Sequence, residues 1–192
     1  MGLRERNRSR TESDLANAAA RLFATQGYEA TTVADIADAA DVSVRTFFRY
    51  FRSKEDVVFA GHDRYLAAMC ETVTEAARAG DEHAVLAAAI RRFARYLQGH
   101  PEVGARLRLA TTDERLFERV LAIRFTWEQA LAEALAKAKG RHDARLDERI
   151  LANALVGALQ VALETWAASE GRADLDRLVR RALDRTPARR GA

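Results

Sequence analysis

A cluster of basic residues in the N-terminal quarter of the chain could bind phosphate. Residues 43–54 contain no acidic residue and four cations, Arg45, Arg49, Arg52 and Lys54. Residues 11–42 hold one arginine against six acidic residues. This separation of basic from acidic residues favours binding to a nucleic-acid backbone, because only cations that reach the phosphates release counterions. Arg45 is the candidate for bidentate reading of guanine in a major groove. A solvated basic face is the alternative that charge alone leaves open.

The elements that must position these cations read as a helix-turn-helix over residues 32–51. Thr32 is expected to cap the first helix with Asp35 in its first turn, and Ser43 is expected to cap the second. Asp41 falls between them, where a turn needs a residue that tolerates left-handed backbone. Helix-turn-helix geometry also occurs in proteins that never touch DNA, so the motif predicts the local fold more firmly than the function.

The second of these helices should have one buried face. Phe47 and Phe51 are four residues apart and therefore lie on the same side. The side chains left free for contact are Val44, Arg45, Phe48, Arg49 and Arg52.

Short motifs follow one another from Leu15 to Val58 in a characteristic order. They are Ala18–Phe23, Gly27–Val33, Asp35–Ala37, Val42–Ser43, Thr46, Tyr50–Phe51 and Ser53–Asp56. Together they resemble the DNA-binding domain of the TetR family of bacterial transcriptional regulators. The resemblance implies a homodimeric repressor that leaves a palindromic operator when a small molecule binds its C-terminal domain.

The resemblance also implies individual DNA contacts, made to phosphates from the two helix caps, to bases from the start of the second helix, and to the backbone beyond it. The candidate DNA-binding residues are Thr32, Ser43, Val44, Arg45, Thr46, Phe48, Arg49, Tyr50 and Lys54. Three positions depart from the family pattern. Asp41 replaces a turn glycine, Arg45 stands where many members have glycine, and Phe48 replaces a tyrosine whose hydroxyl would bind phosphate.

The whole chain predicts an all-α protein, because it is 48% hydrophobic with ten glycines and two prolines among 192 residues. We expect a three-helix helix-turn-helix DNA-binding domain over residues 1–53 and a C-terminal helical bundle for ligand binding and dimerisation over 54–186. Residues 187–192 are expected to be a mobile tail. The longer helices are expected at Ser53–Arg78, Glu82–Gln98, from Pro101, Thr112–Lys139, Asp147–Ser169 and Arg172–Arg185.

The segment Ile150–Leu163 is apolar on nearly all sides, which is typical of a helix buried all round. Pairing with a twofold mate would bury the face that a small monomer leaves exposed. The alternative is a core helix within one subunit. The predicted dimer interface comprises Leu151, Leu155, Leu159, Leu163, Leu175, Leu178, Val179 and Leu183.

A ligand cavity in the C-terminal bundle is expected to be lined by aromatic and long apolar side chains. The candidates are Leu66, Met69, Phe93, Leu97, Leu109, Ile123, Trp127, Gln160 and Trp166. Arg124 could neutralise an acidic ligand there or extend to solvent. The stretch Arg106–Leu135 is similar to the C-terminal domain of mycofactocin-type regulators. That similarity implies a partly apolar effector, such as an acyl-coenzyme A.

Several classes of protein are poorly supported. A single cysteine, Cys70, excludes an internal disulfide. We expect no cofactor and no metal, because no His-Glu-x-x-His motif or Gly-rich phosphate loop occurs. The longest uncharged run is too short for a bilayer and no signal peptide is evident, so we expect a cytoplasmic protein without a membrane partner.

Two rival functions remain at this point. A helical enzyme or binding protein could use Glu128 or Glu164 in a C-terminal cavity, which would require a second polar group beside the carboxylate. A basic amphipathic protein could instead bind membrane surfaces, although this would leave the helix-turn-helix spacing without a role. We expect that the protein is not an enzyme.

Overall fold

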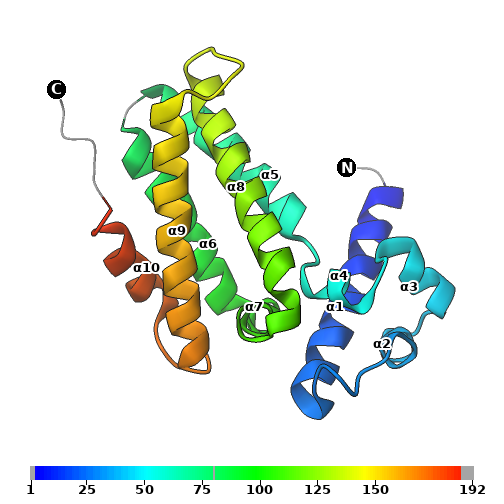
Figure 1. The fold of residues 1–192 in the computed structure, drawn as a ribbon. Helices are drawn as coiled ribbons and strands as arrows, with labels where there is room; N and C mark the ends of the chain where they lie inside the picture. Colours follow the sequence, from blue (N-terminus) through cyan, green and yellow to red (C-terminus); the bar gives the residue numbers. More distant parts are fainter. Residues whose placement is uncertain (1–2, 80, 187–192) are drawn as a thin grey trace.

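The structure, a computed structural model, describes residues 3–79 and 81–186, and this part consists of helices joined by turns (Figure 1). The all-α prediction is confirmed there. The tail expected at residues 187–192 lies outside the described residues. The α-helices are α1 (Leu3–Gln26), α2 (Val33–Ala39), α3 (Val44–Tyr50), α4 (Lys54–Val58), α5 (His62–Ala76), α6 (Glu82–Gly99), α7 (Pro101–Thr112), α8 (Phe117–Ala138), α9 (Leu146–Ala168) and α10 (Leu175–Leu183).

The predicted helix Ser53–Arg78 is wrong as a single element. Helix α4 ends at Val58 and α5 begins at His62. Gly61 separates them with a left-handed backbone, φ 83°. Glycine adopts this conformation without steric cost, so the chain changes direction here.

The predicted start of α8 is also wrong. Helix α7 continues through Thr112, and Asp113 then caps a 3-10 turn over Glu114–Leu116. The Asp113 side chain accepts a hydrogen bond from the Arg115 backbone N–H at 3.0 Å. Because the chain turns at this cap, α8 begins at Phe117.

The N-terminal unit packs α1 against α2 and α4, with α3 against α2. Its core is formed by Leu15, Ala16, Ala18, Ala19, Ile36, Ala37, Phe47, Phe51 and Val57. Figure 1 shows α1–α4 set beside the longer helices of the C-terminal bundle. A separate apolar cluster joins the two units, since Tyr28 and Phe59 pack there with Leu116 at the start of α8.

The C-terminal bundle is organised around α9, which packs against α6, α7, α8 and α10. Among the described residues, α9 is the one helix whose length and hydropathy would suit a membrane span, a property that core helices of bundles share. Its neighbours on several sides account for its apolar composition.

The structure corrects the predicted dimer interface. Six of its eight residues are buried inside the protomer itself: Leu155, Leu159, Leu163, Leu175, Val179 and Leu183. The physical reason is that the apolar face of α10 packs against α9 and α6 of the same chain. Leu151 and Leu178 are half-buried. The large apolar side chains that α8 and α9 expose are Phe117, Leu121, Phe125, Leu146, Ile150 and Val161, each between 45% and 69% exposed.

Candidate nucleic-acid interface and ligand cavity

Helix α3 has one buried and one exposed face. Phe47 is fully buried, and Phe51, at the C-cap, is 6% exposed, as their spacing predicts. Val44 and Phe48 are 41% and 53% exposed. Arg45 and Arg49 are also exposed. Because two phenylalanines hold α3 against the core, its two arginines and the apolar side chains of Val44 and Phe48 are available to a partner.

Side chains determine where α2 and α3 begin. Thr32 Oγ1 accepts a hydrogen bond from the Asp35 N–H at 3.1 Å, and the Asp35 carboxylate accepts one from the Thr32 N–H at 2.8 Å. Hydrogen bonds from the Thr32 backbone and side chain lower the pKa of Asp35. Ser43 Oγ accepts from the Thr46 N–H at 3.1 Å. Thr32 and Ser43 are therefore caps as predicted, while their phosphate contacts stay predictions.

The turn between α2 and α3 is closed by Asp41, which has a left-handed backbone with φ 54°. The following Val42 N–H donates to the Ala37 carbonyl at 3.0 Å, which satisfies the end of α2. Aspartate is one of the few residues besides glycine that visits this conformation routinely. The chain thus makes the turn without the glycine that the family pattern has.

The four cations of residues 43–54 differ in their partners. Arg45 has no ion-pair or hydrogen-bond partner within the described ranges, and Arg49 donates to the Tyr50 hydroxyl at 3.4 Å. Arg52 instead pairs with Asp56 at 3.3 Å. Lys54 Nζ donates to the carbonyls of Tyr28 and Thr31 at 2.7 and 3.0 Å. Of the four cations, only Arg45 and Arg49 therefore donate to no carboxylate or carbonyl oxygen among the described residues.

Lys54 belongs to a junction that sequence reasoning missed. Its ammonium lies 4.3 Å from the centre of the Tyr28 ring, and the Arg115 guanidinium lies 5.1 Å from the same centre. The Tyr28 hydroxyl donates to Glu55 at 2.9 Å. Burial, followed by the hydrogen bond to Glu55, raises the pKa of Tyr28. Cation–π contacts on one ring thus join the start of α4 to the C-terminal bundle.

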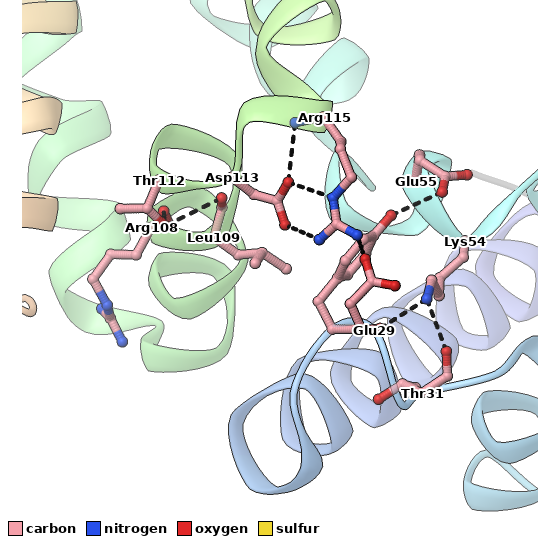
Figure 2. A network of polar contacts seen from close by, with 10 residues as sticks. Glu29, Thr31, Lys54, Glu55, Arg108, Leu109, Thr112, Asp113 and Arg115 are labelled. Atoms are coloured by element: carbon pink, nitrogen blue, oxygen red, sulfur yellow. Dashed lines mark hydrogen bonds and ion pairs between the residues drawn. The ribbon is translucent and has the colours of Figure 1, made fainter.

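Figure 2 shows how Arg115 reaches across this junction. Its Nε donates to Asp113 at 2.9 Å, and its guanidinium forms an ion pair with Glu29 in the turn after α1. A second cross-link lies nearby, since Arg119 of α8 donates to the Asp56 carboxylate at 2.8 Å. The contacts of Arg115 with Glu29 and of Arg119 with Asp56 join residues far apart in the chain, so periodicity gave no signal for them.

A cavity of about 460 Å³ lies between the two units, within the range of small-molecule pockets. Five of the nine predicted lining residues border it: Phe93, Leu97, Ile123, Trp127 and Gln160. The structure corrects the other four. Leu66, Met69 and Trp166 are buried in the bundle core, and Leu109 packs at the junction between the units.

The cavity also has polar lining residues beyond the expected Gln160. Helix α1 of the N-terminal unit contributes Glu12, Ser13 and Asn17, and α7 contributes Arg106. The sequence did hold a signal for Arg106, because it shares a helix face with apolar residues three and four positions away. Arg124 lines the cavity as well, but its guanidinium already pairs with Glu128 at 2.8 Å.

The carboxylates of the rival enzyme hypothesis lie elsewhere. Glu128 and Glu164 are not among the residues that line the cavity. Glu128 is held by Arg124, and Glu164 is exposed and accepts a hydrogen bond from Gln160 at 2.9 Å. The paired carboxylate that this hypothesis requires inside a closed cavity is therefore not formed by these two residues.

Comparison with known proteins agrees with this architecture. Residues 15–60 match the family model described as bacterial regulatory proteins, tetR family, and residues 83–190 match the model of the MftR C-terminal domain. The HTH-type transcriptional regulator TcmR of Streptomyces glaucescens is 49% identical over 72 residues, which are 35% of this chain and 32% of TcmR. The match thus spans about a third of that relative's length.

Solved structures are similar over most of the chain. FadR of Bacillus halodurans, a fatty acid degradation regulator, has a TM-score of 0.65 at 22% identity, over 91% of this chain and 93% of FadR. FadR of Bacillus subtilis, in complex with stearoyl-CoA, has a TM-score of 0.64 at 22% identity, over 90% and 95%. These neighbours are transcriptional regulators, and the likeness at this identity concerns the fold.

The helix-turn-helix, the bundle and the two matched domain models lead to one assignment. The model of the C-terminal domain alone covers more than half of the chain, and the N-terminal model covers the helix-turn-helix. The chain belongs to the TetR family of bacterial transcriptional regulators and carries a C-terminal domain of the MftR type.

Proposed function

We propose that the protein is a homodimeric repressor that binds a palindromic operator and is released when a small molecule enters the cavity. The observation that carries this proposal is the exposure of Arg45 and Arg49 on α3, opposite the buried Phe47. Arg45 would read guanine from the major groove, with Val44 and Thr46 beside it. Phosphates would be bound by Thr32, Ser43, Tyr50 and Lys54. Lys54 would use the ammonium N–H that does not donate to the carbonyls of Tyr28 and Thr31.

The dimer interface is proposed on the exposed apolar side chains of α8 and α9, which include Phe117, Leu121, Phe125, Ile150 and Val161. An apolar surface of this kind marks a contact site, because monomers rarely expose large contiguous patches. A twofold pair would present two copies of α3 to successive major grooves of one duplex. The half-buried Leu151 and Leu178 would lie at the edges of this interface.

Functionally, we divide the chain into a DNA-binding unit over residues 1–53 and an effector-binding and dimerisation unit over 54–186. The cavity touches both, since α1 lines it together with α5–α9. A ligand held there would contact the DNA-binding unit directly. The stearoyl-CoA in one neighbour supports an effector with an acyl chain. Acting on DNA, the protein would work in the cytoplasm.

Selection of bound DNA from a random duplex pool tests the proposal. We expect an inverted repeat whose half-sites are separated by one or two helical turns of about 10.5 base pairs. Sedimentation at the same protein concentration should give a dimer. Recovery of unrelated sequences, or of a single half-site bound by a monomer, would contradict the proposal.

A further inference from the structure

Arg106 is a buried cation in the wall of the cavity. It is 5% exposed, and its Nη1 donates to the carbonyls of Val57 and Ala60 at 3.0 and 3.4 Å. Its Nε is buried without a hydrogen-bond partner, and no ion pair joins it to a carboxylate in the part of the chain that the structure describes. Glu12 and Glu102 line the same cavity, but neither forms an ion pair with Arg106. A buried guanidinium without a bonded carboxylate is costly, so an anion that enters the cavity would stabilise it.

Trp127 supplies a second unpartnered donor on the same cavity. Its indole N–H is buried and has no acceptor, although tryptophan N–H groups usually find one when buried. Trp166 has an unpartnered indole N–H too, but it does not line the cavity. Two residues that border the cavity thus carry a buried N–H donor that lacks an oxygen acceptor, and one of the two residues is charged.

The remaining surface of the cavity is mostly apolar. Phe93 and Leu97 come from α6, and Val156 and Leu159 come from α9. Two further arginines line the cavity: Arg124 is paired with Glu128, and Arg64 donates to the Ser9 hydroxyl. The cavity therefore places a buried guanidinium, to which no carboxylate is bonded among the described residues, beside a long apolar wall. This combination suits a molecule with an anionic head and an apolar body.

We propose that the cavity binds an amphipathic carboxylic acid whose carboxylate pairs with Arg106 and accepts the Trp127 N–H, and that Arg106 transmits this binding to the DNA-binding unit. The first half of the proposal concerns ligand recognition and stands on the cavity alone. The second half rests on the proposed function, because it requires that the protein bind DNA.

The transmission step follows from the other partners of Arg106. The Val57 carbonyl lies in the last turn of α4, and the Ala60 carbonyl lies two residues beyond its end, where the helix dipole favours a cation. Helix α4 begins four residues after α3 ends. A carboxylate that draws the guanidinium toward the cavity weakens these two bonds. The turn between α4 and α5 then loses the hydrogen bonds from Arg106, and the positions of the two copies of α3 change relative to one another.

Calorimetric titration with sodium dodecanoate tests recognition in the full-length protein. Arg106→Lys keeps a charge for the Val57 carbonyl but lacks the Nε–H, and Trp127→Phe keeps an aromatic ring but lacks the indole N–H. We expect dodecanoate affinity to fall by about tenfold or more in Arg106→Lys, and by about threefold or more in Trp127→Phe. Matched controls are Arg108→Lys, two positions along α7, and Trp166→Phe, which should stay within about twofold of the wild type.

Two further ligands separate the charged acid from other acyl compounds. Methyl dodecanoate lacks the charge, and dodecanoyl-CoA presents a neutral thioester to Arg106. Both should bind more weakly than dodecanoate, and their affinity should be insensitive to Arg106→Lys. Equal affinity of the wild type for all three ligands, or unchanged dodecanoate binding in Trp127→Phe and a folded Arg106→Lys, would overturn the inference.

DNA release tests transmission with the operator that selection recovers. Dodecanoate should release the wild type and the Arg108→Lys control, whereas Arg106→Lys should stay bound even at ligand concentrations that saturate it. Release of saturated Arg106→Lys would refute transmission by this residue. If the wild type binds no DNA, the proposed function fails, while the titrations above still decide whether Arg106 recognises a carboxylate.

Discussion

Arg119 of α8 donates a hydrogen bond to Asp56 of α4 across 2.8 Å, and this pair joins the C-terminal bundle to the helix that follows α3. Asp56 also accepts from the backbone N–H of Arg52 at 3.0 Å, at the end of the basic segment. The same carboxylate thus contacts both sides of the junction between the two units. Together with the Tyr28 contacts, it determines how α3 is oriented relative to the bundle.

Removal of this cross-link should change regulation more than stability. Arg119 is 40% exposed, so Arg119→Gln should lower the free energy of unfolding by no more than about 1 kcal/mol. Operator affinity should change more than stability does, because the angle between α3 and the bundle is less constrained. Urea unfolding and fluorescence anisotropy on operator DNA measure the two effects. Loss of more than about 3 kcal/mol with unchanged operator affinity would contradict this role.

Arg45→Ala should relax base preference at one position of each half-site. We expect a loss of about 1–3 kcal/mol on the preferred operator and a smaller loss on unrelated DNA. Salt titrations of DNA binding by anisotropy measure both. Arg21→Ala, an exposed arginine on α1, serves as the control and should leave base preference unchanged. Equal losses on operator and unrelated DNA would show that Arg45 contacts only phosphate.

Asp41→Gly should leave the fold intact and strengthen DNA binding. Glycine accepts the left-handed backbone at this turn, and the change removes a negative charge close to α3. Operator affinity at low salt should therefore rise, with stability within about 1 kcal/mol of the wild type. The control Asp38→Gly removes the same charge from inside α2 and should cost about 1 kcal/mol. Weaker binding by Asp41→Gly would contradict the electrostatic argument.

Glu148 should make the free energy of unfolding depend on pH in the acidic range. It is 2% exposed, and although burial acts to raise its pKa, hydrogen bonds from Arg141 and Lys139 bring the pKa from 4.5 to about 2. A carboxyl whose folded pKa is depressed stabilises the protein above its unfolded pKa and loses this contribution as pH falls. The contribution of up to about 3 kcal/mol should therefore disappear between pH 4.5 and about 2.

Urea unfolding of the wild type and Glu148→Gln over that pH range measures this contribution. The difference in unfolding free energy between the two proteins should be largest near neutral pH and shrink as pH falls. A difference that stays constant down to about pH 2 would show that Glu148 is not held by Arg141 and Lys139.

Two substitutions on α9 should separate association from folding. Val161 is 60% exposed, so Val161→Arg should give a folded monomer with weakened operator binding. Leu159 is 4% exposed, and Leu159→Arg should unfold the protein, because a charge would be buried without a partner. Sedimentation and circular dichroism distinguish the two outcomes. A dimeric Val161→Arg would place the interface elsewhere.

The sequence by itself determined the all-α class, the helix-turn-helix and the faces of α3. Phe47 and Phe51 point inward and Arg45 outward because helix geometry relates residues three and four positions apart, which the sequence records directly. The capping roles of Thr32 and Ser43 are equally local. The motifs that resemble the TetR family lie in this same segment.

Only the tertiary structure decided which apolar faces remain exposed and what surrounds the cavity. Leu155 and Leu175 are apolar in a pattern that suits either a dimer interface or a core, and the return of α10 onto α9 of the same chain buries them. Arg106 meets Val57 and Ala60, 49 and 46 positions away, because α7 lies against the N-terminal unit. Contacts at such separation depend on packing between helices, which periodicity within one helix does not encode.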